Sequence, residues 1–208
     1  MSSPIELYYI TDRSQLGPRP LKASIARAIA AGVDWIQIRE KDMSVRQLLS
    51  LAEAAIEQAS QGTARHTRVI VNDRLDVALA ANASGVHLGA HSMSAAVVRR
   101  IVPSEFRIGV SCHSLEDARA AELAGADYIL LGPVFATPSK ARYGPPLGVE
   151  KLRDVTQRVK LPVFALGGIT AERARECIDS GAAGIAGIRI FQDCEAIDDL
   201  VRELRGLS

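Results

Sequence analysis

The sequence is poor in aromatic residues and carries no excess charge of either sign. Aromatic side chains make up 4% of its 208 residues, whereas alanine, valine, isoleucine, leucine and glycine abound, which suits close packing of helices on a sheet. Lys and Arg number 25 against 24 Asp and Glu, a net charge of +1. No global charge therefore points to a nucleic-acid partner, and any anion binding must be local.

Long apolar runs and paired cysteines are also missing. No hydrophobic stretch is long enough to span a bilayer, and the N-terminus lacks a signal-peptide pattern, so we expect no membrane partner. The three cysteines, Cys112, Cys177 and Cys194, are far apart and form no CxxC pair, which predicts reduced thiols and a cytoplasmic location. With 48% hydrophobic residues, the chain is expected to form a single domain over residues 1–208.

Short apolar strands alternate with amphipathic helices along the whole chain. We predict strands at residues 6–11, 34–38, 67–71, 85–88, 106–110, 128–131, 162–166 and 183–187. We predict helices at residues 21–31, 45–59, 74–81, 94–101, 114–124, 149–160, 171–180 and 193–204. This pattern fits an α/β fold, a (β/α)₈ TIM barrel, better than an open doubly wound sheet. The open sheet would need a glycine-rich dinucleotide fingerprint after the first strand, and Asp12-Arg13-Ser14 is not one.

The loop after the sixth strand, residues 132–148, is the most distinctive stretch of the chain. It is rich in Gly and Pro and carries the hydroxyls of Thr137 and Ser139 beside the cations Lys140 and Arg142. A loop this long in a compact domain is usually either functional or disordered. Hydroxyls and an ammonium group just beyond a buried strand are groups that would hold a phosphate or diphosphate. We therefore predict an anion-binding loop, with a solvated surface loop as the alternative.

In a barrel of this kind the chemistry lies at the C-terminal ends of the strands. Gln37 and Arg39 alternate along the second strand end and so share a face, and Lys41 continues the row. Asn72 and Asp73 follow the third strand. The alternatives are a solvated charge cluster at the first position and an Asx turn at the second.

The remaining strand ends carry further polar residues. His87 and Ser111 end strands four and five, with a satisfied buried histidine as the simpler interpretation of the first, and His113 follows Ser111. Glycines 167 and 168 after strand seven, with Arg189 after strand eight, match the usual phosphate site of such barrels. The cations at the strand ends surround one carboxylate, Asp73, which predicts two phosphorylated groups and a divalent metal such as Mg²⁺.

These motifs together resemble the thiamine phosphate synthase and thiazole tautomerase superfamily, and they lie closer to the synthases. The resemblance covers nearly the whole chain. It rests on the motifs QIREK at 37–41, NDR at 72–74, GVHLG at 85–89, GVSCH at 109–113, DY at 127–128, GPVFATPSK at 132–140 and LGGIT at 166–170.

The resemblance implies a barrel enzyme that joins hydroxymethylpyrimidine diphosphate to a thiazole phosphate, or its carboxylate form, and releases diphosphate. It implies small phosphorylated substrates and leaves a homodimer open. A residue matching Asp73 binds Mg²⁺ in the synthases. Residues matching Arg39, Lys41 and Lys140 stabilise the leaving diphosphate. The pyrimidine diphosphate is held by residues matching Gln37, Arg39, Lys41, Asn72, Ser111 and Lys140, and the thiazole phosphate by residues matching Thr137, Ser139 and Gly168. We add Ile188 and Arg189, which follow strand eight, as candidate substrate-binding residues of this chain.

Two departures from the synthase pattern bear on this assignment. The synthases carry a second Mg²⁺ carboxylate where this chain has Ser92, a poorer ligand for a hard cation. They also have Ser where this chain has Arg189, whose guanidinium would either grip a phosphate or fill its site. The tautomerase branch lacks the second carboxylate too and uses a histidine matching His113 as acid/base. A tautomerase, and a barrel that binds thiamine precursors without catalysis, are therefore the alternatives.

Overall fold

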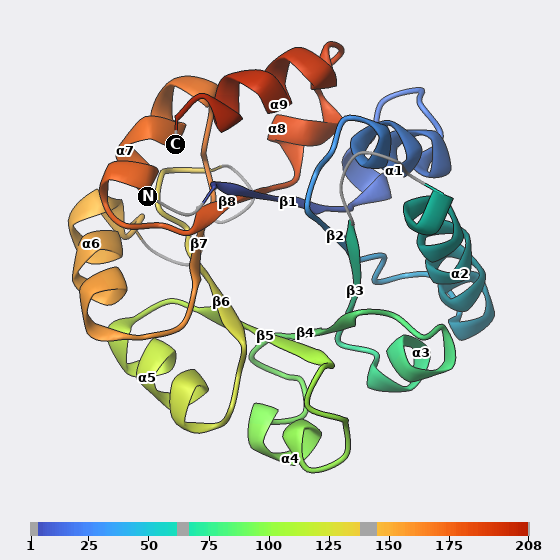
Figure 1. The fold of residues 1–208 in the computed structure, drawn as a ribbon, viewed down its shortest axis with the longest axis horizontal. Helices are drawn as coiled ribbons and strands as arrows, with labels where there is room; N and C mark the ends of the chain where they lie inside the picture. The colour runs from blue at the N-terminus through green and yellow to red at the C-terminus, as the bar shows by residue number, and fades with distance from the viewer. Residues whose placement is uncertain (1–3, 62–66, 138–144, 208) are drawn as a thin grey trace.

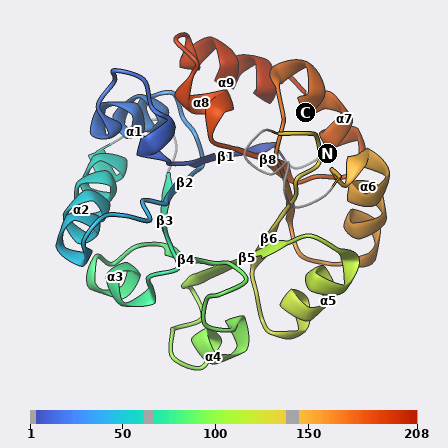
Figure 2. The same ribbon diagram turned by 180° about the vertical axis from the view of Figure 1, so that it is seen from behind.

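Eight parallel strands close into a barrel in which each strand pairs with the next and β8 returns to β1. The computed structural model describes residues 4–61, 67–137 and 145–207. Figures 1 and 2 show the ring of strands enclosed by helices on all sides. The TIM barrel predicted from the alternation of elements is confirmed. The strands are β1 (Glu6–Ile10), β2 (Trp35–Ile38), β3 (Arg68–Asn72), β4 (Gly85–Leu88), β5 (Arg107–Cys112), β6 (Tyr128–Leu131), β7 (Val163–Leu166) and β8 (Gly184–Gly187).

The helices follow the prediction closely except after β8. The last helix was predicted to begin at residue 193, which is wrong, because residues 189–192 already form a one-turn helix and α9 begins only at Ile197. A single 3₁₀ turn, η1 (Arg13–Gln15), was also not predicted. The helices are α1 (Leu21–Ala30), α2 (Val45–Gln61), α3 (Leu75–Ala80), α4 (Ala95–Arg99), α5 (Leu115–Leu123), α6 (Gly148–Arg158), α7 (Ala171–Asp179), α8 (Arg189–Gln192) and α9 (Ile197–Arg205).

Serine side chains begin three of these helices, as their spacing predicts. Ser94 and Ser114 accept hydrogen bonds from backbone N–H groups of the first turns of α4 and α5. The Ser44 hydroxyl does the same for the N–H of Gln47 in α2. Capping of this kind satisfies donors that the helix itself leaves unpaired.

Most of the apolar side chains lie between the strands and the helices. Alternate residues of each strand point outward and pack under the helical layer, as Leu7, Ile36, Val86 and Ile129 do, and all four are fully buried. Alanine is frequent on the inner faces of the helices, for example Ala52 and others on α2. Small residues there bring helices close to the sheet, and this burial supplies the main stabilising term.

The other strand face points into the barrel, and it holds a large share of the few aromatic residues. Tyr8, Trp35, Tyr128 and Phe164 form one buried cluster whose ring centroids lie 5.0–5.9 Å apart. The hydroxyls of Tyr8 and Tyr128 are 2.8 Å apart, and burial raises the pKa of both phenols. We call these four residues the aromatic plug, since they fill the barrel interior.

Glycines make room for the plug. A Cβ on Gly109 of β5 would lie 2.2 Å from Cζ of Tyr128. One on Gly184 of β8 would lie 2.0 Å from the backbone oxygen of Glu6 on β1 and 2.9 Å from Cε1 of Phe164. These distances are well inside van der Waals contact, so glycine at these positions lets β5 face the plug and lets β8 approach both the plug and β1.

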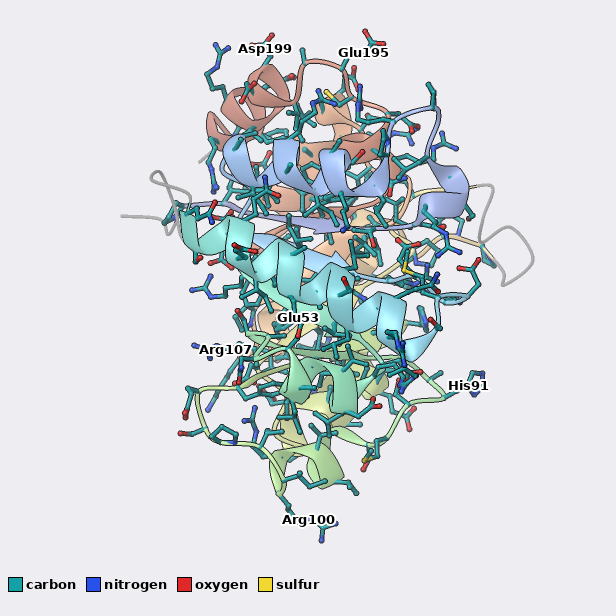
Figure 3. The ribbon with its side chains drawn as sticks, turned by 90° about the vertical axis from the view of Figure 1, so that its right-hand side faces the viewer. Glu53, His91, Arg100, Arg107, Glu195 and Asp199 are labelled. Carbon is teal, nitrogen blue, oxygen red and sulfur yellow. The ribbon has the colours of Figure 1, made fainter. Side chains whose placement is uncertain are left out.

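The two ends of the barrel differ in what they carry. Figure 3 shows Arg107, which begins β5, at one end and His91, which follows β4, projecting from the opposite, C-terminal end. At the first end the indole N–H of Trp35 donates to Glu6 (2.8 Å), and the guanidinium of Arg68 lies 4.7 Å from the Trp35 ring. The polar residues predicted to bind substrate lie toward the C-terminal ends. Among the described residues no helix has both the length and the apolar character needed to cross a membrane.

Gly109→Ala is expected to lower the free energy of unfolding by about 1–3 kcal/mol or more, because the added methyl group collides with the Tyr128 ring and the plug has no space to yield. Urea denaturation would measure this loss.

The matched control is Gly17→Ala, where no atom lies within 4 Å of the added carbon. Its unfolding free energy should stay within about 0.5 kcal/mol of the parent. Equal effects of the two substitutions would mean that Tyr128 does not pack against Gly109.

Candidate active site

A polar layer of four side chains lies inside the barrel, on the C-terminal side of the aromatic plug. Gln37 of β2 donates from Nε2 to Oδ1 of Asn72 on β3 (2.8 Å). Across the next strand pair, Nε2 of His87 on β4 lies 2.9 Å from Oγ of Ser111 on β5. Gln37, Asn72 and Ser111, which were predicted to bind substrate, are thus brought together on adjacent strands.

Two atoms of the polar layer are buried without a hydrogen-bond partner among the described residues. They are Oε1 of Gln37 and Nδ1 of His87. Gln37 is 1% and His87 2% exposed. Buried polar groups are nearly always paired, and leaving one unpaired costs about 1–3 kcal/mol. Two such atoms in one layer indicate a place where a ligand supplies the missing partners.

His87 is the site residue that sequence reasoning missed. It was given the simpler interpretation of a satisfied buried histidine, and it is buried, but one ring nitrogen has no partner among the residues that the structure describes. Burial, with the nearby positive charge of Arg39, lowers its pKa from 6.5 to about 3, so the ring is neutral at physiological pH. His87 pairs with Asn72 on β3 and with Gly109 on β5, and both of these positions face the barrel interior. This strand pairing is the signal that places His87 on the inner face.

The charged residues at the end of β2 alternate between the barrel mouth and the buried interior. Arg39 is 27% exposed at the barrel mouth, and Lys41 is exposed. Glu40 between them is buried and accepts hydrogen bonds from the Thr11 hydroxyl (2.6 Å) and the backbone N–H of Arg13 (3.1 Å). Burial raises the pKa of Glu40 despite these bonds. Glu40 thereby anchors the strand end, and Arg39 and Lys41 remain at the mouth.

Asp73 and Ser92 line one open hollow of about 500 Å³ next to this polar layer. Asp73 is exposed and adopts a left-handed backbone with φ of 65°. Its carboxylate accepts no hydrogen bond from any residue that the structure describes, so its oxygens are available to a cation. The Ser92 hydroxyl accepts the N–H of Gly89 (2.8 Å). His91 is exposed and points away from the barrel (Figure 3).

The hollow has part of what the Mg²⁺ site implied by the resemblance needs. Within residues 4–61, 67–137 and 145–207, no three His, Cys, Asp or Glu side chains gather as a metal-binding group. Mg²⁺, however, is commonly held by one or two carboxylates together with substrate phosphates and water. Asp73 fits that limited role, and Ser92 adds a neutral oxygen in the same hollow.

His113 lies at the mouth, on the opposite side of the strand from Cys112. Cys112 is fully buried in the outer core, and burial raises the pKa of its thiol to about 12. His113 is exposed, its backbone N–H donates to Asp117 (2.9 Å), and its Nδ1 bonds the carbonyl oxygen of Gly132. A carbonyl oxygen only accepts, so Nδ1 carries the proton and Nε2 is the basic nitrogen.

The start of the β6–α6 loop is fixed to the end of β7. The N–H of Phe135 donates to the carbonyl of Gly167 (3.0 Å). Gly168 has φ of 65°, and a Cβ there would lie 2.5 Å from the carbonyl oxygen of Ala136. Half-buried Thr137 follows Ala136 directly in the chain, and its predicted role in binding the thiazole phosphate stays a prediction. Ser139 and Lys140, also predicted to bind substrate, lie outside the described residues.

The residues after β8 divide between the barrel and the surface. Ile188 is half-buried and packs against the plug cluster. Arg189 begins α8, and its side chain is 62% exposed, with Nε 3.5 Å from Asp193 of the next turn. The prediction that Arg189 binds substrate therefore depends on its leaving a weak surface ion pair.

The pH dependence of folding offers a test of the His87 environment. The unfolded chain binds a proton near pH 6.5, whereas the folded chain does so only near pH 3. Stability from this group is therefore present above pH 6.5 and lost as the pH falls toward 3, by roughly 2 kcal/mol at about pH 5.

His87→Gln should flatten the fall in unfolding free energy between about pH 8 and pH 5, measured by urea denaturation at each pH. The control, His91→Gln at an exposed position, should follow the parent. A parent and a His87→Gln variant with the same slope would contradict a neutral, buried imidazole.

Comparison with known proteins identifies the family of this chain. Residues 7–191 match the family model described as thiamine monophosphate synthase. A relative from Geobacter sulfurreducens, described as a putative thiamine-phosphate synthase, is 49% identical over 180 residues, which are 86% of this chain and 83% of the relative. The thiamine-phosphate synthase of Syntrophomonas wolfei is 38% identical over 207 residues, 99% of this chain and 97% of that one.

A solved structure gives the same answer. The thiamine phosphate pyrophosphorylase from Pyrococcus furiosus superposes with a TM-score of 0.86 at 36% identity and covers 98% of this chain and 95% of that chain. The resemblance inferred from the strand-end motifs is confirmed. This chain belongs to the thiamine monophosphate synthase family.

Proposed function

We propose that this protein is a thiamine phosphate synthase, a transferase that couples hydroxymethylpyrimidine diphosphate to a thiazole phosphate or its carboxylate form. The bond between the pyrimidine methylene carbon and the diphosphate oxygen breaks, and a bond from that carbon to the thiazole nitrogen forms. The products are thiamine phosphate and diphosphate. The family and the names of the relatives support this reaction.

The polar layer is the observation that carries the proposal. An aminopyrimidine ring presents both N–H donors and ring-nitrogen acceptors along its edge. The unpartnered Oε1 of Gln37 accepts a hydrogen bond, and the neutral His87 ring offers Nδ1. The Ser111 hydroxyl can donate or accept beside them. A layer that is polar, buried and incomplete therefore suits this heterocycle.

The cations at the mouth match the leaving group. Loss of diphosphate leaves a cation on the methylene carbon that the aminopyrimidine ring stabilises. The main task of the protein is then to stabilise the departing negative charge, which we assign to Arg39, Lys41 and Lys140. The thiazole nitrogen held nearby traps the cation. The protein supplies no nucleophile, in keeping with a buried Cys112.

The thiazole phosphate is assigned to the opposite side of the mouth. Gly168 permits close approach of Ala136 in the β6–α6 loop, and Thr137 is the next residue in the chain. Ser139 and Lys140 continue the same loop in sequence. Ile188 gives an apolar wall, and Arg189 would reach the phosphate from the start of α8 by exchanging Asp193 for substrate.

Asp73 and Ser92 would hold Mg²⁺ in the hollow beside the diphosphate. When bound, the ion neutralises charge on the leaving group. Asp76 also lines the hollow, but it is paired with Arg74 at 2.5 Å. Asp73 would therefore be the main carboxylate, and diphosphate oxygens and water would supply the remaining ligands. Ser92, whose hydroxyl already accepts the N–H of Gly89, contributes little. We therefore assign this chain a weaker Mg²⁺ site than one built from two carboxylates.

A tautomerase acting on thiazole carboxylate phosphate is the second candidate, and the state of His113 favours it. The Gly132 carbonyl fixes the proton on Nδ1, so Nε2 is a competent base at the mouth. The intact row of Gln37, Arg39 and Lys41 weighs against this candidate, since an isomerisation has no diphosphate to bind.

The proposal also covers cellular location, binding partners and oligomeric state. All three cysteines are free, which suits reduced thiols in the cytoplasm. The partners are small phosphorylated molecules, with neither nucleic acid nor membrane involved. A homodimer is compatible with the proposal and is not required by it.

The decisive test supplies the parent protein with pyrimidine diphosphate, thiazole phosphate and Mg²⁺ and follows both thiamine phosphate and free diphosphate. We expect the two products in equal amounts. His113→Ala should reduce the rate less than about tenfold, because the coupling needs no proton transfer by an imidazole, whose loss would cost more.

A tautomerase would behave differently. It would release no diphosphate and would isomerise thiazole carboxylate phosphate without metal. His113→Ala would then cost on the order of 10²–10⁴ in rate. That result would overturn the synthase assignment.

Ser92→Asp should tighten Mg²⁺ binding by about tenfold, because a second carboxylate replaces a neutral hydroxyl in the hollow. Calorimetric titration of Mg²⁺ into protein with inorganic diphosphate measures this directly. Ser94→Asp, two residues away at the α4 cap, is the control and should leave the affinity unchanged. An unaltered affinity in Ser92→Asp would place the ion elsewhere.

A further inference from the structure

One side chain joins the one-turn helix after β8 to the first strand. Gln192 of α8 is 4% exposed. Its Oε1 accepts the Tyr9 hydroxyl (3.1 Å) and the backbone N–H of Asp12 (2.8 Å), and its Nε2 donates to the carbonyl of Asp12 (3.1 Å). Figure 1 shows α8 beside β1, where the barrel closes. Both polar atoms of this amide therefore bond to β1 or to the residue two positions after it.

The residue that Gln192 holds in turn faces a cation of the mouth. Oδ2 of Asp12 lies 3.7 Å from Nη1 of Arg39. The carboxylate also accepts the N–H and hydroxyl of Ser14 (3.2 and 2.5 Å) and Nε2 of Gln15 (2.5 Å). Burial raises the pKa of Asp12, but these hydrogen bonds and Arg39 outweigh it, and the net shift is downward. Asp12 is thus ionised and fixed in place.

The backbone of Arg39 is held from the same side. Its N–H donates to the Thr11 hydroxyl (3.0 Å), and that hydroxyl donates to buried Glu40 (2.6 Å). The end of β1 therefore fixes Arg39 at its backbone through Thr11 and at its guanidinium through Asp12. An arginine side chain otherwise has several freely rotating bonds, and fixing them before substrate arrives reduces the entropy lost on binding.

We infer that Asp12 is a positioning residue for Arg39 and that Gln192 keeps Asp12 in place, so that α8 and the diphosphate cation act as one unit. This inference rests on the proposed function. Arg39 contacts diphosphate, and Asp12 and Gln192 act only through Arg39.

A double-mutant cycle tests the inference, with binding of inorganic diphosphate and kcat as the two readouts. Asp12→Asn keeps the shape of the side chain and removes its charge. Gln192→Met keeps the volume and removes the hydrogen bonds to Tyr9 and Asp12. Each should weaken diphosphate binding and lower kcat by about three- to tenfold, with the KM for thiazole phosphate unchanged. In an Arg39→Gln background neither should have any further effect.

Asp42→Asn is the matched control, because Asp42 is an exposed carboxylate that pairs with Arg13 at 2.7 Å. It should leave both readouts unchanged. If Gln192→Met fails to fold, the isosteric Asp12→Asn still decides the matter.

Two results would overturn the inference. If the Asp12 carboxylate only reduced the positive charge of Arg39, its removal in Asp12→Asn would tighten diphosphate binding. A purely structural role would make the effect of Asp12→Asn equal in the parent and in the Arg39→Gln background. Failure of the proposed function looks different, because the parent protein would then release no diphosphate from the pyrimidine substrate.

Discussion

Four aromatic side chains form the centre of the packing inside the barrel, and the remaining features of the site depend on that packing. Tyr8, Trp35, Tyr128 and Phe164 pack together there with aliphatic residues of the same cluster, and the phenol hydroxyls of the two tyrosines hydrogen-bond each other at 2.8 Å. The packed side chains leave the C-terminal end as the place for a ligand. There Gln37 and its neighbours form a polar layer over the plug, which is where the proposed function places the pyrimidine ring.

Alternation along the strands determines which side chains at the strand ends are buried and which can reach a substrate. Neighbouring residues at a strand end point to opposite sides, so buried Cys112 precedes exposed His113, and buried Glu40 separates Arg39 from Lys41. The buried member of each pair fixes the strand end, and the exposed member remains available to substrate. A shift of one residue in either strand would exchange the two roles.

The sequence predicted the barrel and most of the strand-end residues, because short apolar runs separated by helical periods leave few architectures open. It did not predict the role of His87. In β4 every residue is buried, so apolarity does not tell the inner from the outer face of a parallel strand. Only pairing with β3 and β5 places His87 beside Ser111. The one-turn α8 was missed for a related reason, since four residues are too few for a helical period to emerge.

A nearly neutral chain can still bind a highly charged substrate, because what matters is which cations are already paired. Arg74 bonds Asp76 at 2.5 Å, and Arg99 bonds Asp127, so these guanidinium groups are committed. Arg39 lies 3.7 Å from its carboxylate, and its partner orients it more than it neutralises it. Lys41 forms no ion pair with any residue that the structure describes. Under the proposed function, affinity for diphosphate would arise from the loose pairing of a few mouth cations. The net charge of +1 is a sum over the whole chain and does not distinguish these cations from those held in ion pairs such as Arg74–Asp76.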